Sequence, residues 1–260
     1  MTIDEVHEVL LGIAKEFHRI CEENDIPYYM LGGTMLGAIR HKGFIPWDDD
    51  MDFGVPREYF SKLEKIFQEQ SAPYYHLRTV NNSKTIINDP AKYEDKRTLI
   101  IEPEMANINE EIGINIDIFP LDKTNGNKSF FSKNNFVHII GLINTYRYCN
   151  MKHLNWWRKC LALCFRIVFF PFDKLYLLEF AKKHLIPQHG NYISNLYGFW
   201  GVRETIPADV MGNPVKYQFE DTCLWGAEKY DIYLKSLYGD YLKIPSRENM
   251  HIHLTNAFKK

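Results

Sequence analysis

Residues 31–56 hold most of the side chains in this sequence whose types and spacing suit chemistry on a phosphate ester. A glycine pair opens the stretch, a basic triplet follows, and closely spaced carboxylates end it. Glycines let the backbone approach a phosphate, N–H groups at a helix start favour an anion, and Arg and Lys neutralise phosphate oxygens. The expected substrate contacts along this stretch are Gly32, Gly33, Thr34, Arg40, His41, Lys42, Trp47 and Asp49.

Two of the aspartates that end the stretch have the spacing of a metal site. Side chains alternate across a strand, so Asp50 and Asp52 share one face, about 7 Å apart along the chain, if residues 51–55 are extended. Such a pair suits Mg²⁺ or Mn²⁺, whose other ligands are waters and substrate phosphates. A solvated loop is the alternative. Crowding four acids (with Asp48 and Asp49) against apolar neighbours is costly unless a cation compensates, which favours the metal site.

A third carboxylate lies on the clearest strand of the sequence, residues 113–122. Three isoleucines alternate with Asn115, Asp117 and Phe119, so one face is apolar and the other is available for a site. A carboxylate on such a strand could be a third metal ligand or a base for an attacking hydroxyl. An aspartate facing water at a sheet edge is the alternative. Asp122 is expected to be a turn or cap residue.

The elements around these residues predict a compact α/β unit over residues 1–125. Apolar residues recur at helical spacing over residues 3–24, and a strand at residues 28–31 leads into the glycine pair. A short helix to about residue 40, a strand at 51–55 and a helix to about residue 70 complete the order helix, strand, helix, strand, helix. Further strands are expected at residues 75–80 and 98–102.

The remainder of the chain is expected to form a helical acceptor or lid region, residues 126–190, and a C-terminal part, residues 191–260, that packs back on the core to give one compact unit. Helix 156–172 is apolar nearly all round and basic in places. A buried core helix is favoured, and a surface that rests on a membrane or a lipid-linked acceptor is the alternative. Strands at 192–196 and 215–219 and a helix at 227–238 follow. His251 and His253 could reach a phosphate or be surface residues.

Composition indicates a soluble globular protein without a bias toward nucleic acid. The chain has 260 residues, 45% of them hydrophobic and 25% charged, with a net charge of −2. This charge gives no general reason to expect binding to nucleic acid. Five cysteines without zinc-site spacing favour a reduced, cytoplasmic location, at most at the inner face of the membrane. No signal peptide or spanning segment is expected.

The stretch 31–56 resembles the LicD family, bacterial phosphotransferases related to the fukutin proteins within the nucleotidyltransferase superfamily. That superfamily has a glycine pair, then Asp-x-Asp on a strand, then a third carboxylate on a later strand. The corresponding residues here are Gly32-Gly33, Asp50-Met51-Asp52 and Asp117. The resemblance is close over residues 5–60 and visible again near residues 117–122 and 231–245. It favours Asp117 as the third carboxylate. It also makes Lys92 and Arg97, which are expected to lie between the strands at 75–80 and 98–102, candidates for phosphate contacts, and surface charges on a hairpin are the equal alternative.

The resemblance implies a nucleotidyltransferase-type α/β (α+β) fold, with a mixed sheet flanked by helices and an additional helical region. It also implies a metal-dependent transferase in which Asp50, Asp52 and Asp117 are the catalytic carboxylates. The expected donor is CDP-choline, whose phosphocholine passes to a hydroxyl of a cell-surface glycan or its lipid-linked precursor, releasing CMP. Glycerol- and ribitol-phosphate donors are alternatives.

Three other functions fit parts of the pattern. In true nucleotidyl transfer, the same carboxylates would move a nucleoside monophosphate and release pyrophosphate. A glycosyltransferase could use Asp-x-Asp to hold a nucleotide-sugar, but the glycine pair and basic triplet give it no support. A non-catalytic nucleotide-binding module is the third. The alcohol also stays open, because tryptophans for a choline cage (Trp47, Trp156, Trp157, Trp200 and Trp225) and hydrogen-bonding groups for a polyol are both plentiful.

Overall fold

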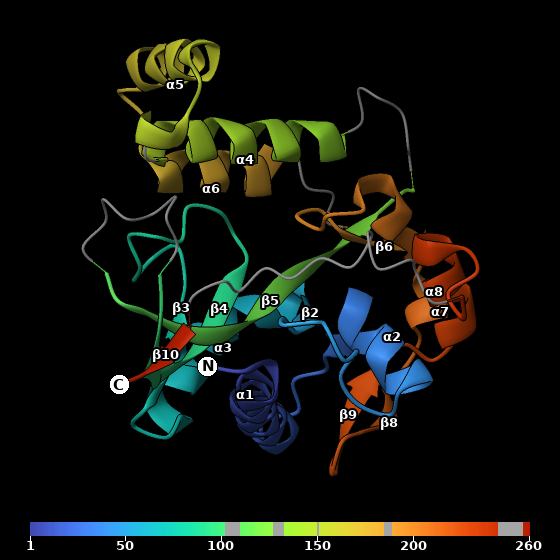
Figure 1. Ribbon diagram of the computed structural model, residues 1–260. Coiled ribbons are helices and arrows are strands. Elements are labelled where there is room, and N and C mark those ends of the chain that lie inside the picture. The colour runs from blue at the N-terminus through green and yellow to red at the C-terminus, as the bar shows by residue number, and fades with distance from the viewer. Residues whose placement is uncertain (102–109, 127–132, 150, 185–188, 244–256) are drawn as a thin grey trace.

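The computed structural model describes residues 1–101, 110–126, 133–149, 151–184, 189–243 and 257–260. A mixed sheet in the order β1-β2-β5-β4-β10 forms its centre; β3 pairs with β4, and β6 joins β5 to β7. The expected mixed sheet flanked by helices is confirmed (Figure 1). The sheet strands are β1 Tyr29–Met30, β2 Asp52–Pro56, β3 Tyr75–Arg78, β4 Ala91–Ile100, β5 Ile112–Thr124, β6 Tyr192–Asn195, β7 Thr205–Pro207 and β10 Ala257–Lys259.

The helices lie on both sides of this sheet, and a separate hairpin packs beside β1. The helices are α1 Ile3–Glu23, α2 Gly32–Arg40, α3 Arg57–Gln70, α4 Lys133–Tyr148, α5 Trp156–Val168, α6 Lys174–His184, α7 Ala208–Met211 and α8 Tyr230–Tyr238, with 3-10 turns η2 Met151–His153 and η3 Gly201–Glu204. The hairpin pairs β8 (Val215–Phe219) with β9 (Thr222–Gly226).

Helix α1 is the main support beneath the sheet. Thr2 and Glu5 form a capping box at its start, each side chain accepting from the other residue's backbone N–H. Its apolar stripe is fully buried at Leu10, Ile13 and Phe17, as the helical spacing of the sequence predicts. Ile114, Ile116 and Ile118 of β5 are also fully buried, and α1 contacts this strand. The polar residues between those isoleucines therefore face the other side of the sheet.

The pairing of three adjacent strands sets one row of residues across the sheet. β2 and β5 are parallel, with Asp52 directly opposite Asp117. β4 is antiparallel to β5, with Lys92 opposite Asp117 on the other side. Side chains in one row of adjacent strands point to the same face. The register therefore brings Asp52, Asp117 and Lys92 together on the face that α1 leaves open.

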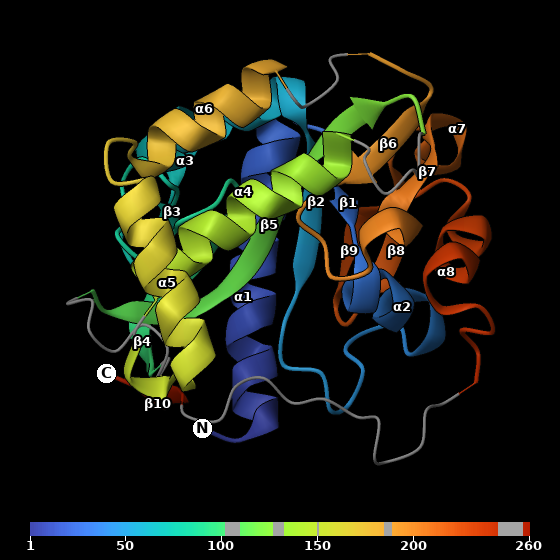
Figure 2. The same cartoon turned by 90° about the horizontal axis from the view of Figure 1, so that it is seen from above.

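A layer of three helices, α4, α5 and α6, covers part of the sheet from above (Figures 1 and 2). Its buried side chains meet the loop between β3 and β4 in a small second core, formed by Val80, Ile86, Ile140, Ile143, Leu177 and Leu178. Lys174 donates from Nζ to the carbonyls of Ser83 and Ile86, 2.8 and 2.7 Å away. Asn144 donates to the Ile87 carbonyl at 3.1 Å. The layer is thus attached to the β3–β4 loop.

Helix 156–172 is shorter and far more exposed than the sequence led us to expect. It ends at Val168, and Ala162 is the buried residue along its length. The expectation of a core helix is wrong because α5 is the outermost helix of its layer, where only one face meets neighbouring helices. None of the described helices has the length and apolar character needed to cross a membrane.

Three smaller expectations also need correction. Asp122 is not a turn residue; it lies buried in β5 and pairs with Arg57, because β5 runs on to Thr124. Lys92 and Arg97 do not lie between strands, since β4 spans both. The helix expected at 227–238 begins three residues later, at Tyr230. His251 and His253 lie outside the described residues.

Asp122 and its neighbour Lys123 offer a matched test of buried and exposed ion pairs. Arg57 donates from Nε and Nη2 to Asp122 at 2.7 and 2.8 Å, and the carboxylate is 1% exposed. Asp122→Asn should cost about 3 kcal/mol, because it leaves a buried guanidinium without one of its counter-charges. Urea unfolding measures this cost.

Lys123→Gln is the control, because it breaks the adjacent exposed pair between Lys123 Nζ and Glu58 Oε1, 3.4 Å apart. It should cost less than about 0.5 kcal/mol. Equal costs for the two variants would contradict a structural role for the buried pair.

Candidate active site

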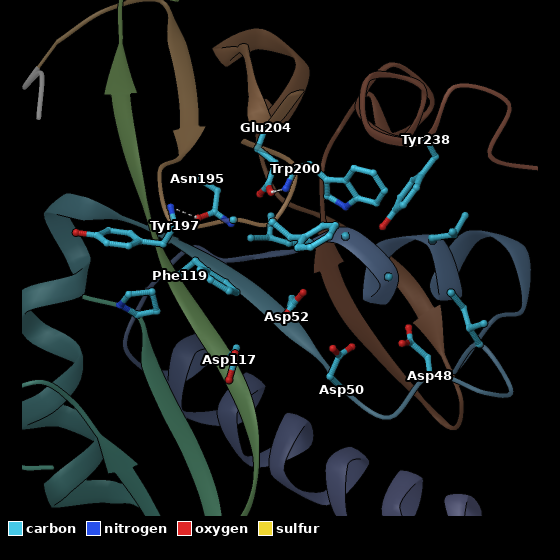
Figure 3. A pocket seen from close by; sticks show the side chains of 18 of the residues that line it. Asp48, Asp50, Asp52, Asp117, Phe119, Asn195, Tyr197, Trp200, Glu204 and Tyr238 are labelled. Atoms are coloured by element: carbon cyan, nitrogen blue, oxygen red, sulfur yellow. Dashed lines mark hydrogen bonds between the residues drawn. The ribbon is translucent and has the colours of Figure 1, made fainter. Parts of the chain in front are cut away.

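A cavity of about 1090 Å³ opens where β2 and β5 carry their polar face. Figure 3 shows aspartates from β2, β5 and the segment before β2 along one wall, and Glu204, Trp200 and Tyr238 across from them. The cavity is lined by residues of the expected core and of the C-terminal part, among them Gly32, Gly33, Arg40, Trp47, Asp48, Asp50, Asp52, Asn88, Lys92, Asp117, Phe119, Asn195, Tyr197, Trp200, Glu204, Tyr238 and Tyr241. It therefore joins the expected core to the C-terminal part.

The row set by strand pairing forms the floor of this cavity. Lys92 donates from Nζ to Asp117 Oδ1 at 2.7 Å and to Asn115 Oδ1 at 3.2 Å. Asp52 is the next residue along the row, on β2. Asp50 precedes the strand and also lines the cavity, while Met51 is buried beneath, as alternation predicts. The expected catalytic carboxylates Asp50, Asp52 and Asp117 thus meet in one cavity.

The start of α2 fixes Asp52 from the side. Thr34 accepts the Asp52 backbone N–H on its hydroxyl at 2.8 Å, and the Asp52 carbonyl accepts from the Leu31 N–H at 2.9 Å. Thr34 therefore positions a carboxylate rather than lining the cavity itself. Gly32 donates its N–H to Tyr233 Oη at 2.9 Å, so this N–H is directed at the protein and not at a phosphate.

Both residues of the glycine pair have a specific structural reason to be glycine. Gly32 has φ +47, a conformation that side chains with a Cβ rarely adopt. At Gly33, a Cβ would lie 2.6 Å from Asp48 Oδ2, so glycine lets this carboxylate approach the start of α2 without a shift of the Asp48 side chain. The glycine pair thus makes room for a carboxylate in addition to allowing backbone approach.

Crowding of carboxylates in a buried place raises their pKa values. Burial is the largest cause at Asp52, whose pKa lies well above its usual range, and the charges of Asp50 and Asp117 add to it. Burial, then Asp50 and Asp49, raises the pKa of Asp48 to about 8. Glu204 is also affected by burial, which raises its pKa to about 7. Such a cluster is stable as anions only with positive charge nearby.

Oxygen donors in this cluster fit a hard divalent cation such as Mg²⁺ or Mn²⁺. Within the described ranges, no three His, Cys, Asp or Glu side chains are grouped closely enough to hold a metal ion by themselves. Mg²⁺ usually takes one or two carboxylates from the protein and completes its shell with waters and phosphate oxygens. Asp50 and Asp52 suit that partial role, with Asp117 beside them.

The cationic residues divide between the cavity and the rest of the surface. Arg40 and Lys92 line the cavity. Burial lowers the pKa of Arg40. Its guanidinium donates to His41 Nε2 at 2.9 Å and to the Tyr241 carbonyl at 3.2 Å. His41 and Lys42 are not among the lining residues, and neither is Asp49, which is buried.

The structure does not bring Arg97 to the cavity. Its guanidinium binds both carboxylate oxygens of Asp95 and lies 3.8 Å from the centroid of the Tyr74 ring. Strand β4 explains the difference from Lys92. Its pairing with β5 is interrupted between Asp95 and Ile100, so Arg97 lies outside the regular register that sets Lys92 beside Asp117.

Most of the opposite wall was not foreseen from the sequence, which singled out Trp200 alone among its residues. The wall comes from β6, the loop after it, η3 and α8, and consists of Asn195, Tyr197, Trp200, Glu204 and Tyr238. Glu204 Oε1 accepts the Trp200 backbone N–H at 2.8 Å, and the rings of Trp200 and Tyr238 meet edge to face at 5.2 Å. A strand at residues 192–196 was expected, but nothing in the sequence indicates that it pairs with β5 and so carries this wall into the site.

Among the tryptophans considered for binding a cation, Trp47 and Trp200 line the cavity. Trp225 belongs to β9 and stacks on Tyr28, and Trp156 and Trp157 are on the surface of α5.

Comparison with known families agrees with this geometry. Residues 25–139 match the model of the family described as LicD/FKTN/FKRP, nucleotidyltransferase domain. The chain carries a LicD-family nucleotidyltransferase domain. The LicD match contains Gly32-Gly33, Asp50, Asp52, Lys92 and Asp117, and it confirms both the resemblance seen in the sequence and the fold that it implied.

The chain is 27% identical over 267 residues to the lipopolysaccharide cholinephosphotransferase LicD of Haemophilus influenzae, covering 97% of this chain and 96% of that protein. Two shorter matches fall on parts of other chains. An uncharacterized protein of Rickettsia typhi is 45% identical over 69 residues, 26% of this chain and 22% of its own. The human ribitol 5-phosphate transferase FKRP is 38% identical over 47 residues, 18% of this chain and 10% of its own.

A divalent cation should stabilise this protein through the crowded carboxylates. We expect Mg²⁺ or Mn²⁺ at a hundredfold excess over its Kd to add about 3 kcal/mol to the free energy of unfolding, because binding to the folded state alone shifts the equilibrium. Asp52→Asn should abolish this gain. In EDTA, this variant should have a higher melting temperature than the wild type, because it removes one of the buried negative charges that repel each other. Differential scanning calorimetry measures both effects.

Asp25→Asn, at an exposed turn residue outside the cavity, should retain the full gain. A cation effect of equal size in Asp52→Asn would mean that the ion binds elsewhere.

Proposed function

We propose that this protein transfers phosphocholine from CDP-choline to a hydroxyl group of a cell-surface glycan or its lipid-linked precursor, with release of CMP. The carboxylate row of Asp52 and Asp117 beside Lys92 supports the transfer, because it places acidic and basic groups within one cavity. Choline and a lipopolysaccharide acceptor are named for the Haemophilus influenzae relative that matches along nearly the whole chain.

The donor diphosphate would meet the carboxylates through a divalent metal held by Asp50 and Asp52. When bound, such an ion neutralises phosphate charge and polarises the phosphorus–oxygen bond that breaks. Arg40 and Lys92 would contribute fixed positive charge at the cavity wall, where burial makes each charge more effective than in water. Catalysis of this kind depends mainly on positioning and electrostatic stabilisation.

The transfer step needs a group that accepts the proton of the attacking hydroxyl. The hydroxyl oxygen forms a bond to the phosphorus that carries choline, and the bond from that phosphorus to the oxygen of CMP breaks. Asp117 faces the cavity from the middle of β5, with its orientation set by Lys92 Nζ at 2.7 Å. Asp117 is therefore assigned as the proton acceptor, and CMP leaves with the electron pair of the broken bond.

The wall across from the carboxylates suits the quaternary ammonium of choline. Aromatic faces attract such a cation, and a buried carboxylate strengthens the attraction. Trp200 and Tyr238 supply the rings. The ring pair adjoins the start of α2, because Tyr238 Oη lies 3.6 Å from the position that a Cβ atom on Gly32 would occupy. Arg203 already lies 5.7 Å from the Trp200 ring centroid, which is the geometry of cation attraction.

A polyol phosphate is the main alternative to phosphocholine. The ribitol 5-phosphate transferase FKRP matches only a short stretch of the chain, which favours choline. True nucleotidyl transfer would use the same carboxylates and would show itself by preference for CTP. All five cysteines are free, and we place the reaction in a reducing, cytoplasmic compartment on that basis.

Donor binding and turnover test the proposed reaction directly. We expect Mg²⁺-dependent binding of CDP-choline by calorimetry, and CMP release that exceeds the release from CDP-glycerol, CDP-ribitol and CTP. Lys92→Met should lower CMP release by about a hundredfold or more, because it removes the cation beside Asp117. Arg97→Gln, on the same strand but facing away, should leave the rate unchanged.

Preference for CTP would replace this proposal with nucleotidyl transfer. Absence of binding by a folded protein would point to a non-catalytic module.

Glu204→Gln and Trp200→Leu test the choline wall. Each should weaken binding of CDP-choline by about tenfold relative to CDP-glycerol, since each removes attraction for the ammonium group. Equal losses for the two donors in calorimetry would contradict a role in recognising choline.

Stability supplies an independent check on Glu204. Burial raises its folded pKa to about 7, so the charged form destabilises the folded state above that pH. As the pH falls from 7 toward the pKa of Glu204 in the unfolded state, the folded state takes up the proton first, and the free energy of unfolding rises. In EDTA, Glu204→Gln should therefore be more stable than the wild type at pH 8, by up to about 3 kcal/mol, and the difference should fade near pH 5.

A further inference from the structure

Helix α5 presents an unbroken apolar stripe to solvent. Trp156, Leu163 and Ile167 recur at helical spacing and so share one face, and Phe170 continues the stripe just beyond the helix end. Their exposed fractions are 78, 52, 67 and 84% respectively. Figure 1 shows α5 on the far side of α4 from the sheet, so this stripe is the outermost surface of the helical layer.

The opposite face of α5 is apolar too. Ala162, Phe165 and Phe169 turn toward the rest of the layer, where the two phenylalanines pack against the second core. A helix at the surface of a water-soluble protein normally carries polar residues on its outer face. Further apolar side chains of the same layer are also exposed: Trp157 and Val168 on α5, and Phe172, Leu175, Tyr176 and Phe180 in the turn and helix that follow. Exposed apolar side chains gathered in this number on one layer mark an interaction surface.

The charge of this layer indicates what kind of partner it meets. Residues 133–184 contain nine Lys and Arg but two Asp and Glu, in a chain whose overall net charge is −2. Arg147, Arg166 and Lys174 donate to backbone carbonyls, which leaves their positive charges without a carboxylate in these contacts. Arg158 and Lys159 are exposed on α5 itself. The surface is therefore apolar and cationic together.

We propose that the α5 face docks on the surface of an anionic lipid bilayer. An interfacial helix buries its apolar side at the boundary of headgroups and acyl chains while nearby Lys and Arg reach the phosphates. Exposed tryptophans such as Trp156 suit the same boundary. A second copy of this face is a poor partner, because it would bring two cationic surfaces together.

The contacts of the layer would transmit this docking to the cavity. Lys174 and Asn144 hold the carbonyls of Ile86 and Ile87, and both of these residues line the cavity. A bilayer under α5 would therefore hold the cavity at a fixed distance from lipid. A lipid-linked acceptor would then reach the carboxylates without leaving the membrane.

Vesicle co-sedimentation of the whole protein tests the proposal. Partitioning should be at least about tenfold stronger on phosphatidylcholine vesicles with about 30 mol % phosphatidylglycerol than on phosphatidylcholine alone, and should weaken at high salt. The double variant Leu163→Gln/Ile167→Gln should lose about tenfold or more on the anionic vesicles, because it removes apolar contact without changing charge. Arg158→Gln/Lys159→Gln should lose the preference for phosphatidylglycerol.

Ile232→Gln, at an exposed position on α8, is the matched control and should bind as the wild type does. Melting temperatures and CDP-choline binding in solution should be the same for all variants, which separates this test from that of the proposed reaction. Equal binding of the stripe variant and the wild type would overturn the proposal. The proposal would also be overturned if the wild type did not bind vesicles and if sedimentation velocity showed a dimer for the wild type and a monomer for the stripe variant.

Discussion

The parallel register of β2 and β5 is the constraint on which the rest of the structure depends. It sets Asp52 beside Asp117, two like charges in adjacent strands, and the antiparallel register of β4 adds Lys92 to the row. Shifting either pairing by one residue would turn the carboxylates into the core and the isoleucines of β5 outward. The apolar residues that alternate with the site residues, such as Phe53 and Ile116, are fully buried and so resist such a shift. The same strand register therefore determines both the packing of the core and the placement of the charged residues.

A cluster of acids at this position costs stability, and the surrounding structure offsets that cost locally. Thr34 fixes the backbone of Asp52, Gly33 makes room for Asp48, and Lys92 contacts Asp117. Burial still raises the pKa of Asp52, Asp48 and Glu204, so the repulsion is only partly relieved. Strain of this electrostatic kind is typical of sites that gain a cation or a substrate.

Local patterns predicted much of this architecture, whereas pairing between distant segments did not follow from them. The burial of one face of α1 and of β5, the helix start at the glycine pair and the meeting of Asp50, Asp52 and Asp117 all follow from spacing within short stretches, with the family resemblance deciding for Asp117. Arg97 was predicted to contact phosphate but does not line the cavity, because the pairing of β4 with β5 is interrupted between Asp95 and Ile100. Asp122 was misplaced because its partner, Arg57, lies on a different element.

The wall formed by Trp200, Glu204 and Tyr238 depends on β6 pairing with β5, which no local pattern specifies. Helix α5 was misjudged for a related reason. Its apolar composition predicted burial, but composition alone does not say which faces of a helix pack against other elements and which stay exposed.

The attachment of the helical layer has a consequence for how such enzymes diverge. Lys174, Asn144 and the second core join the layer to the loop between β3 and β4, apart from the strand pairings that set Asp52, Asp117 and Lys92 in register. Natural selection could therefore remodel or replace the layer while the strand register that places the charged residues of the cavity is inherited unchanged. Exchanging this segment between relatives would leave that register intact.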